Sequence, residues 1–219
     1  MKSLPKLWKW RLAQYLEIRW WKNYLNSKDK DTYYQWKKSY WNDFIRRTSS
    51  FAPLRPGMKI LDAGCGPAGL FTKLTKQQVT AVDPLLIQYQ KQLPLFDPGD
   101  YPHTRFINLP LEEYVESDSF DQVYCVNVIN HVNDPAAVIE NLACCLIQGG
   151  IMVLSVDAHR RKWLKNIFQW IPGDVLHPHQ HDLNQYVEWL TKAGFSILHT
   201  DKLKSEAIFD YWLILAEKR

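Results

Sequence analysis

The chain has 219 residues, of which 46% are hydrophobic and 23% are charged, a composition that suits one folded domain with an appendage. No stretch approaches the roughly eighteen uncharged apolar residues of a membrane span, and the Lys- and Trp-rich start lacks the apolar centre of a signal peptide, so a cytoplasmic protein is expected. The four cysteines form no C-x-x-C pair, which favours reduced thiols and argues against a zinc site.

Residues 1–50 form a basic, aromatic segment. They contain 12 Lys and Arg against 4 Asp and Glu, a net charge of +8, whereas the whole chain carries +4. Apolar residues within 4–25 recur every three or four positions, which predicts an amphipathic helix. A second helix is predicted from about residue 31 to residue 47, with Asp31 or Thr32 near its cap, and the proline-rich stretch 51–57 ends it.

This helical pair is predicted to be a cover, residues 1–50, on a body formed by residues 51–219. Three roles are open for the cover. Its aromatic side chains could simply pack on the body, it could close over a substrate as a lid, or it could contact a membrane surface or a nucleic acid.

A glycine-rich turn organises the body. A short apolar strand at 59–62 runs into Gly64-Cys65-Gly66-Pro67-Ala68-Gly69, which has the spacing G-x-G-x-x-G. Glycines at this spacing let backbone N–H groups approach a ligand closely. Asp62 stands two positions before the first glycine, and Asp83 ends the next apolar strand, 79–82.

Strands and helices then alternate. Helices are predicted at 70–77, 84–93 and 135–147, the last ended by Gly149-Gly150, and strands at 105–107, 121–126 and 151–156. This repetition predicts a parallel sheet with helices on both faces.

The end of the chain departs from the repeat. An insertion, 158–181, precedes a helix at 183–193, for which Asp182 and Gln185 have capping-box spacing, and strands at 195–199 and 209–216 follow. The predicted fold is therefore α/β: a Rossmann-like, seven-stranded, mostly parallel sheet with a terminal antiparallel hairpin and a helical N-terminal cover.

Several ordered motifs carry a family resemblance over residues 57–219. They are Leu61-Asp62-Ala63-Gly64-Cys65-Gly66-Pro67-Ala68-Gly69, Ala81-Val82-Asp83, Ser119-Phe120-Asp121-Gln122-Val123, Val128-Ile129-Asn130-His131-Val132-Asn133-Asp134-Pro135 and Gln148-Gly149-Gly150. Together they resemble the class I S-adenosylmethionine-dependent methyltransferases of the small-molecule type (methyltransferase-11/25-like). A nicotinamide or flavin Rossmann domain is the main rival, because Asp83 also fits its fingerprint. Asp62, the block at 120–135 and the terminal hairpin favour the methyltransferase.

The resemblance implies roles for individual residues in binding S-adenosylmethionine. Gly64, Cys65, Gly66 and Gly69 would form the turn beside its methionine part, and Asp62 would orient the ammonium group. Asp83 would accept hydrogen bonds from the ribose hydroxyls. The structural alternatives are a turn cap for Asp62 and a helix N-cap for Asp83.

The adenine end departs from the family pattern. Many members have an acidic residue shortly after the third strand, where this chain has Leu109 or Pro110. Adenine is therefore expected to contact backbone groups and apolar surface near Leu109. Asn127 follows the fourth strand, where ligands of doubly wound sheets bind, so it is a candidate contact for cofactor or substrate.

Histidines are the candidate general bases, since an imidazole, whose pKa is ordinarily about 6.5, can accept a proton at neutral pH. The candidates are His131, His177, His179 and His181. His131 could instead fix its turn, and the cluster 177–181 could be structural or, with its alternating spacing, bind a metal. No metal is expected, because no Asp, Glu or Cys partner is evident.

The acceptor is expected to be a small molecule, first of all a sugar or another metabolite hydroxyl that becomes O-methylated. The opening pattern from Glu17 to Leu25 faintly resembles that of some methyltransferases associated with surface polysaccharide. Two alternatives stand beside it: an RNA methyltransferase that uses the basic N-terminal helices, and a non-catalytic cofactor-binding or assembly protein. A nucleic-acid partner is not expected, and the oligomeric state is open.

Overall fold

A computed structural model describes residues 4–26, 28–159, 181–205 and 209–219. Its centre is a seven-stranded sheet in which the first five strands are parallel and the last two form an antiparallel hairpin at one edge. The predicted fold class is confirmed. The strands, in spatial order, are β3 (Thr104–Ile107), β2 (Gln78–Val82), β1 (Lys59–Ala63), β4 (Phe120–Val126), β5 (Leu146–His159), β7 (Phe209–Lys218) and β6 (Phe195–Ser205).

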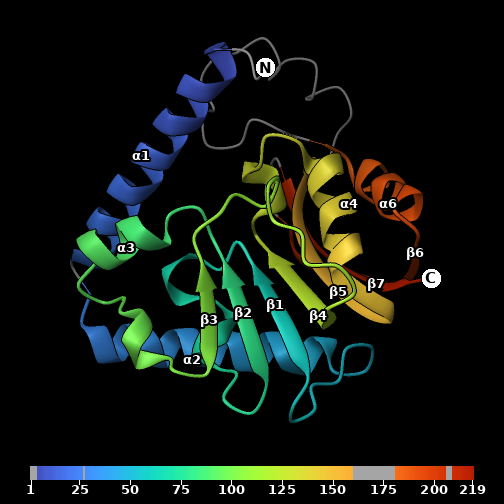
Figure 1. Cartoon of the computed structure of the whole chain (residues 1–219), viewed down its shortest axis with the longest axis horizontal. Coiled ribbons are helices and arrows are strands. Elements are labelled where there is room, and N and C mark those ends of the chain that lie inside the picture. The colour runs from blue at the N-terminus through green and yellow to red at the C-terminus, as the bar shows by residue number, and fades with distance from the viewer. Residues whose placement is uncertain (1–3, 27, 160–180, 206–208) are drawn as a thin grey trace.

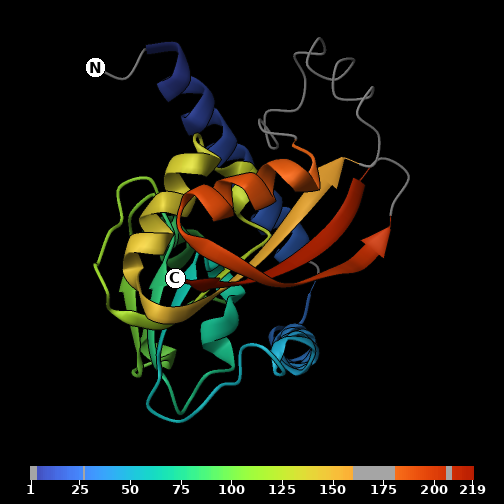
Figure 2. The ribbon, with the colours of Figure 1, turned by 90° about the vertical axis from the view of Figure 1, so that its right-hand side faces the viewer.

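Helices cover both faces of the sheet. Because successive side chains of a strand point to opposite faces, each central strand contributes residues to two cores. Leu61 and Val123 belong to a core under α4 (Pro135–Cys145) and α6 (Leu183–Lys192). Ile60 and Tyr124 belong to a core under α1 (Leu4–Asn26), α2 (Lys30–Thr48) and α3 (Leu86–Gln92). Figure 2 shows α4 to the left of the sheet and α2, seen end-on, to the right.

The connection between β1 and β2 holds no α-helix, so the helix predicted at 70–77 is wrong. Its 14 residues form only two single 3₁₀ turns, Gly66–Ala68 and Leu70–Thr72. The Asp62 carboxylate accepts from the backbone N–H of Phe71, and Thr72 Oγ1 donates to the Gly69 carbonyl, so the chain bends back at once towards β2.

Helix α2 covers the area that this missing helix leaves open. It crosses the sheet behind β1–β3 (Figure 1), and Trp41, Phe44 and Tyr33 are buried against the sheet and the glycine turn. Trp41 Nε1 donates to the Ala68 carbonyl at 3.1 Å, which ties α2 directly to the turn. The N-terminal segment is thus part of the core that supports β1 and β2.

Two element boundaries differ from the sequence-based expectation. The cap of α2 is Asp29, which accepts from the Thr32 backbone N–H at 2.9 Å, instead of Asp31 or Thr32. Strand β5 begins at Leu146, and Gly149-Gly150 lie inside it at a register shift opposite residues 120–122 of β4. The predicted cap of α6 is confirmed, since the Asp182 carboxylate accepts from the Gln185 N–H.

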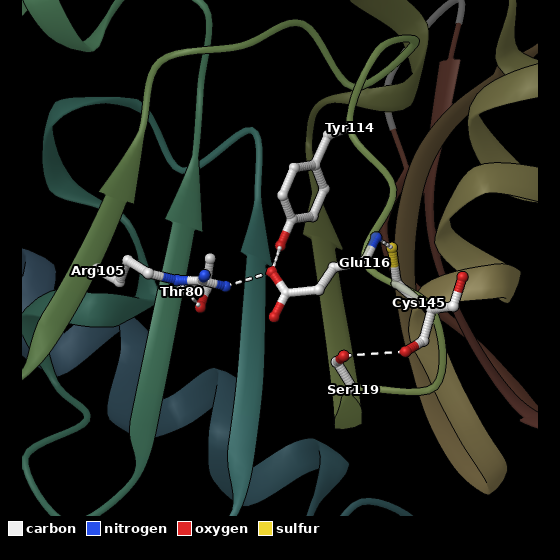
Figure 3. Close-up of polar contacts among 7 residues, drawn as sticks. Thr80, Arg105, Tyr114, Glu116, Ser119 and Cys145 are labelled. Atoms are coloured by element: carbon white, nitrogen blue, oxygen red, sulfur yellow. Dashed lines mark hydrogen bonds and ion pairs between the residues drawn. The ribbon is translucent and has the colours of Figure 1, made fainter.

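The loop after β3 is fixed to the sheet by a polar cluster (Figure 3). The Glu116 carboxylate accepts from the Tyr114 hydroxyl at 2.9 Å and pairs with the Arg105 guanidinium, which also donates to Thr80 Oγ1 at 3.2 Å. The cluster ties the loop that runs from the end of β3 to the start of β4 against β2 and β3. Among the described helices, none combines the length and apolar character needed to cross a membrane.

Candidate functional site

A cavity of about 700 Å³ lies between the glycine turn and the two N-terminal helices. It stands at the carboxyl ends of β1, β2 and β4, where ligands bind in open α/β sheets. Its walls come from five parts of the chain: α1 and α2, the glycine turn, the residues after β2, the loop after β3, and the segment after β4. The residues that line the cavity include Glu17, Trp20, Trp21, Tyr24, Tyr33, Trp36, Lys37, Tyr40, Gly64, Cys65, Gly66, Asp83, Pro110, Leu111, Glu112, Asn127, His131 and Tyr211.

The glycine turn needs its glycines for two different reasons. Gly64 (φ +70°) and Gly66 (φ +57°) have left-handed backbone conformations that side chains disfavour. A Cβ at Gly64 would lie 2.3 Å from Val128 Cγ1, whereas a Cβ at Gly66 would meet only Trp21 at 4.0 Å. Gly66 therefore faces open space between the turn and α1. Gly69 instead lies over the Asp62 carboxylate, 2.5 Å from where its Cβ would be.

Asp62 is buried beneath the turn. Its Oδ2 accepts from the Phe71 N–H at 3.0 Å, which is the turn-capping geometry that the sequence left open as an alternative. Burial raises the pKa of Asp62 to about 7, although the backbone donors and Lys37 oppose the shift. The ammonium-binding role of Asp62 stays a prediction.

Asp83 joins the turn to the segment after β2. Its Oδ2 accepts from the Gly66 N–H at 3.0 Å and its Oδ1 from the Leu85 N–H at 2.8 Å. Burial, followed by the nearby charge of Glu17, raises the pKa of Asp83 to about 7. Each carboxylate oxygen keeps a second lone pair, so the ribose-binding role predicted for Asp83 is compatible with these contacts.

Glu17 extends the acidic end of the cavity from α1. Its Oε1 accepts from the Tyr89 hydroxyl at 2.9 Å, and Tyr89 is buried beneath Asp83 in the core of α3. No sequence pattern predicts Glu17 as a cavity residue, because it is a single acid in an aromatic helical segment.

Asn127 has a strained backbone at the end of β4. Its φ is +60°, which is uncommon for a residue other than glycine, and such strain concentrates at functional sites. The Asn127 N–H donates to Ser155 Oγ at 2.8 Å, and Ser155 Oγ lies 2.7 Å from the Tyr211 hydroxyl. Tyr211 in turn contacts Tyr40 of α2, so these side chains link the sheet to the cover across the cavity.

The loop after β3, where the sequence predicts the adenine contact, forms one wall of the cavity. Pro110, Leu111 and Glu112 line the cavity, whereas Leu109 is 37% exposed and does not line it. Glu112 already accepts from the Asn133 N–H at 2.7 Å. Leu109 therefore does not line the cavity, and Pro110 and Leu111 are the apolar residues of this loop that do.

The structure separates the candidate histidines. His131 lines the cavity in a 3₁₀ turn after β4, Ile129–His131. His181 does not line it and packs edge-on against Tyr186 and Trp189 of α6, at 5.9 and 4.7 Å between ring centroids. His177 and His179 lie outside the described residues. Within the described ranges, no group of three His, Cys, Asp or Glu side chains is arranged to hold a metal.

The cavity suits S-adenosylmethionine on physical grounds. Gly66 leaves space beside the turn, and the carboxylates of Asp83 and Glu17 line one end of the cavity. Asp62 is buried beneath the turn, and its charge and that of Glu17 both act on Asp83. An acidic cavity favours a ligand that carries a sulfonium and an ammonium group. Asp83 has free acceptor capacity for hydroxyls, as a ribose requires.

Comparisons with known proteins indicate the family of the chain. A family model described as a methyltransferase domain matches residues 33–200. The ubiquinone biosynthesis O-methyltransferase of Idiomarina loihiensis is 30% identical over 136 residues, covering 57% of this chain and 54% of that protein. The enzyme of the same description from Xanthomonas campestris pv. campestris (strain B100) is 36% identical over 107 residues, covering 46% and 43%. The chain thus spans about half the length of these curated relatives.

Solved structures share the fold at low sequence identity. The [4+2]-cyclase SpnF superposes with a TM-score of 0.65 and 16% identity, with 80% of each chain covered. Magnesium protoporphyrin IX methyltransferase from Synechocystis PCC 6803, solved with bound S-adenosylhomocysteine, superposes with a TM-score of 0.58 and 21% identity, with 83% of each chain covered.

Proposed function

Because this chain belongs to the family of methyltransferase domains, we propose that it transfers the methyl group of S-adenosylmethionine to a hydroxyl of a small molecule, first of all a sugar. The sequence-based identification of a class I methyltransferase enzyme with S-adenosylmethionine as its cofactor is confirmed at the level of the family. The chemical nature of the acceptor is our inference from the cavity.

One observation carries the proposal: the glycine turn and an aromatic wall line the same cavity. The aromatic wall is defined by six rings of α1 and α2 that contact one another in sequence, Trp20, Trp21, Tyr24, Tyr33, Trp36 and Tyr40. Trp20 and Trp36 are 50% and 52% exposed, and Tyr24 stacks on one face of Trp20, so part of the ring surface of this wall is left uncovered.

Uncovered indole faces beside tyrosine hydroxyls suit an acceptor with flat apolar faces and polar edges. A sugar ring has this form, because its C–H groups make apolar faces and its hydroxyls point outward. A phenolic ring has it too, and the curated relatives named as ubiquinone biosynthesis O-methyltransferases favour a phenol as the second candidate.

The chemistry requires alignment and proton acceptance. The sulfonium of S-adenosylmethionine supplies an activated methyl group. The protein must hold the acceptor oxygen in line with it and keep water out. His131 is the candidate base at the cavity wall, and a neutral imidazole can take the hydroxyl proton at neutral pH.

The test is a methyl-transfer assay with labelled S-adenosylmethionine. The purified chain is incubated with free and nucleotide-linked sugars, with catechols and phenols, and with RNA. Labelled methyl groups on a sugar oxygen support the first candidate, and labelled phenol ethers support the second. Methylated RNA would overturn the small-molecule proposal, and cofactor binding without transfer to any acceptor would favour the non-catalytic alternative.

Matched tryptophan and phenylalanine variants locate the acceptor. Trp36→Ala removes a half-exposed ring of the aromatic wall, and Phe51→Ala removes a ring that stacks on His199 outside the cavity. We expect Trp36→Ala to raise the acceptor KM with unchanged cofactor affinity and Phe51→Ala to change neither. Equal kinetics for the two variants would place the acceptor elsewhere.

A further inference from the structure

Three hydroxyl groups form a chain that leads from the inside of the sheet to the cavity wall. Ser155 Oγ of β5 accepts from the Asn127 N–H at 2.8 Å and lies 2.7 Å from the Tyr211 hydroxyl of β7. Tyr211 in turn contacts Tyr40 of α2. Asn127, Tyr211 and Tyr40 line the cavity, whereas Ser155 is fully buried and does not line it.

Burial fixes the direction in which these hydroxyls donate. A backbone N–H can only donate, so the Asn127 N–H occupies one lone pair of Ser155 Oγ. A fully buried hydroxyl needs an acceptor for its own proton, and the Tyr211 oxygen is the acceptor that the described residues offer. Ser155 therefore donates to Tyr211, and the Tyr211 proton turns away from Ser155, towards Tyr40 and the cavity.

The acidity of the two phenols agrees with this direction. Burial raises the pKa of both Tyr211 and Tyr40. The hydrogen bond from Ser155 opposes the rise in the pKa of Tyr211, and the hydrogen bond from Tyr211 opposes the rise in that of Tyr40. Hydrogen bonds that follow one another in this way strengthen each other. Within the described ranges no residue accepts from the Tyr40 hydroxyl, so the chain ends in a donor at the cavity wall.

The order of the strands places this donor beyond the predicted position of the cofactor. With the ribose at Asp83 and the methionine part at the glycine turn, the cofactor spans the ends of β2 and β1. Tyr211 lies on β7, and β4 and β5 stand between β1 and β7. These three strand spacings amount to roughly 14 Å. His131, the candidate base, follows β4. The tyrosine hydroxyls therefore stand on the side of the cavity that is left to the methyl acceptor.

We propose that the Tyr40 and Tyr211 hydroxyls bind a hydrogen-bond-accepting oxygen of the methyl acceptor, other than the oxygen that is methylated. This inference rests on the proposed function and narrows its substrate class. The bound oxygen is a second one, because a donor on the attacking oxygen would stabilise the ground state more than the transition state. An ether, carbonyl or hydroxyl oxygen satisfies the two donors, whereas an apolar group in its place leaves them unpaired. Ser155 is a positioning residue that acts through Tyr211.

The experiment measures methyl transfer to two matched probes. 2-Methoxyphenol carries an ether oxygen beside its hydroxyl, and 2-ethylphenol has a methylene group in place of that oxygen. We expect the unchanged chain to have the higher kcat/KM for 2-methoxyphenol. Tyr40→Phe and Tyr211→Phe should each lower this kcat/KM about 10-fold, the size of one hydrogen bond. Their kcat/KM for 2-ethylphenol and their affinity for S-adenosylhomocysteine should not change. Where the labelled-methyl assay finds a sugar acceptor, that sugar and its single-deoxy analogues replace the phenols.

Two further variants separate a specific contact from a general defect. Tyr34→Phe also removes a tyrosine hydroxyl from α2, but this hydroxyl donates to the Leu95 carbonyl at 2.5 Å and Tyr34 does not line the cavity. It should match the unchanged chain with both probes. Ser155→Ala keeps both phenols and should lower the preference for 2-methoxyphenol by a smaller factor than Tyr40→Phe does.

The inference is overturned if Tyr40→Phe and Tyr211→Phe change the kcat/KM of both probes equally, or change neither. If the unchanged chain transfers a methyl group to no acceptor at all, the proposed function fails instead, which is a distinguishable result.

Discussion

The two faces of the sheet are covered in different ways. On one face α4 comes after β4 and α6 comes before β6 in the chain, and both bury an apolar core that includes Val138, Leu142 and Leu190. On the other face the short β1–β2 connection leaves a gap, and α1 and α2 fill it from the start of the chain. Figure 1 shows both N-terminal helices on the side of β1–β3.

The two faces also differ in what their residues contact. The α4 and α6 face is a packing core. The α1 and α2 face shares its residues between core and cavity, since Tyr33 and Trp41 are buried in the core and also line the cavity. Substitutions on the first face should change stability alone, and those on the second should change stability and ligand binding together.

The largest effect is expected at the glycine turn. In Gly64→Ala the new Cβ would collide with Val128 at 2.3 Å as well as carrying the strain of a positive φ. We expect S-adenosylhomocysteine binding to fall by at least about 100-fold, the order of a misplaced binding turn. Gly57→Ala is the matched control, because Gly57 has a φ of +81° but nothing within 4 Å of its Cβ position. Calorimetry on both variants measures the difference, and equal affinities would remove the turn from the site.

The histidines give the next largest effect. His131 lines the cavity, and His181 packs on α6 outside it. We expect His131→Ala to lower kcat by about 10²- to 10⁴-fold, the usual contribution of a general base, and His181→Ala to leave kcat nearly unchanged. Turnover with a saturating acceptor is the measurement. A larger loss in the second variant would move the base to the 177–181 segment.

Matched truncations compare the two faces directly. Leu142→Ala on α4 and Phe44→Ala on α2 each remove a buried side chain and should lower the free energy of unfolding by about 3–5 kcal/mol. Only Phe44→Ala should also weaken S-adenosylhomocysteine, because α2 holds the glycine turn through Trp41. Denaturant unfolding and calorimetry on the folded fraction test this. An equal loss of affinity in Leu142→Ala would erase the contrast between the faces.

The smallest effect concerns pH. The pKa values of Asp62 and Asp83 are raised to about 7 by burial, so the folded state binds more protons than the unfolded state between about pH 4 and pH 7. The free energy of unfolding should therefore fall as pH rises through this window and then level off. We expect a Tm several degrees lower at pH 8 than at pH 5.

Glu17→Gln tests the cause of this pH dependence. The variant keeps an acceptor for the Tyr89 hydroxyl but removes the charge that helps to raise the pKa of Asp83. The fall in Tm between pH 5 and pH 8 should be smaller in this variant. An unchanged pH dependence would show that Glu17 does not act on Asp83.

Much of the fold could be predicted because strands and helices produce regular spacings of apolar residues in the sequence. The strands, the terminal hairpin and both N-terminal helices follow from residue periodicity and caps. The missing helix at 70–77 could not be predicted, because Leu70, Phe71 and Leu74 have helix-like spacing. The Phe71 N–H instead donates to the Asp62 carboxylate, nine residues earlier, and this bond holds the chain in a non-helical turn. No local sequence pattern predicts the bond.

The site was predictable where backbone geometry defines it and not where distant segments meet. The glycines of the turn and Asp83 are readable from spacing. Glu17, Lys37 and Tyr211 come from three other elements, and only their packing brings them to the cavity. In the same way, proximity in the sequence placed His181 among the candidate bases, whereas the structure packs it against Trp189.

The most direct test of the account is a crystal structure of the full chain with S-adenosylhomocysteine. We expect the amino-acid group of the ligand between the glycine turn and α2, and the ribose hydroxyls on Asp83. The aromatic wall should then face the sulfur. A ligand bound on the α4 and α6 side, or bound at the turn without contact to α1 or α2, would contradict the claim that the N-terminal helices form part of the site.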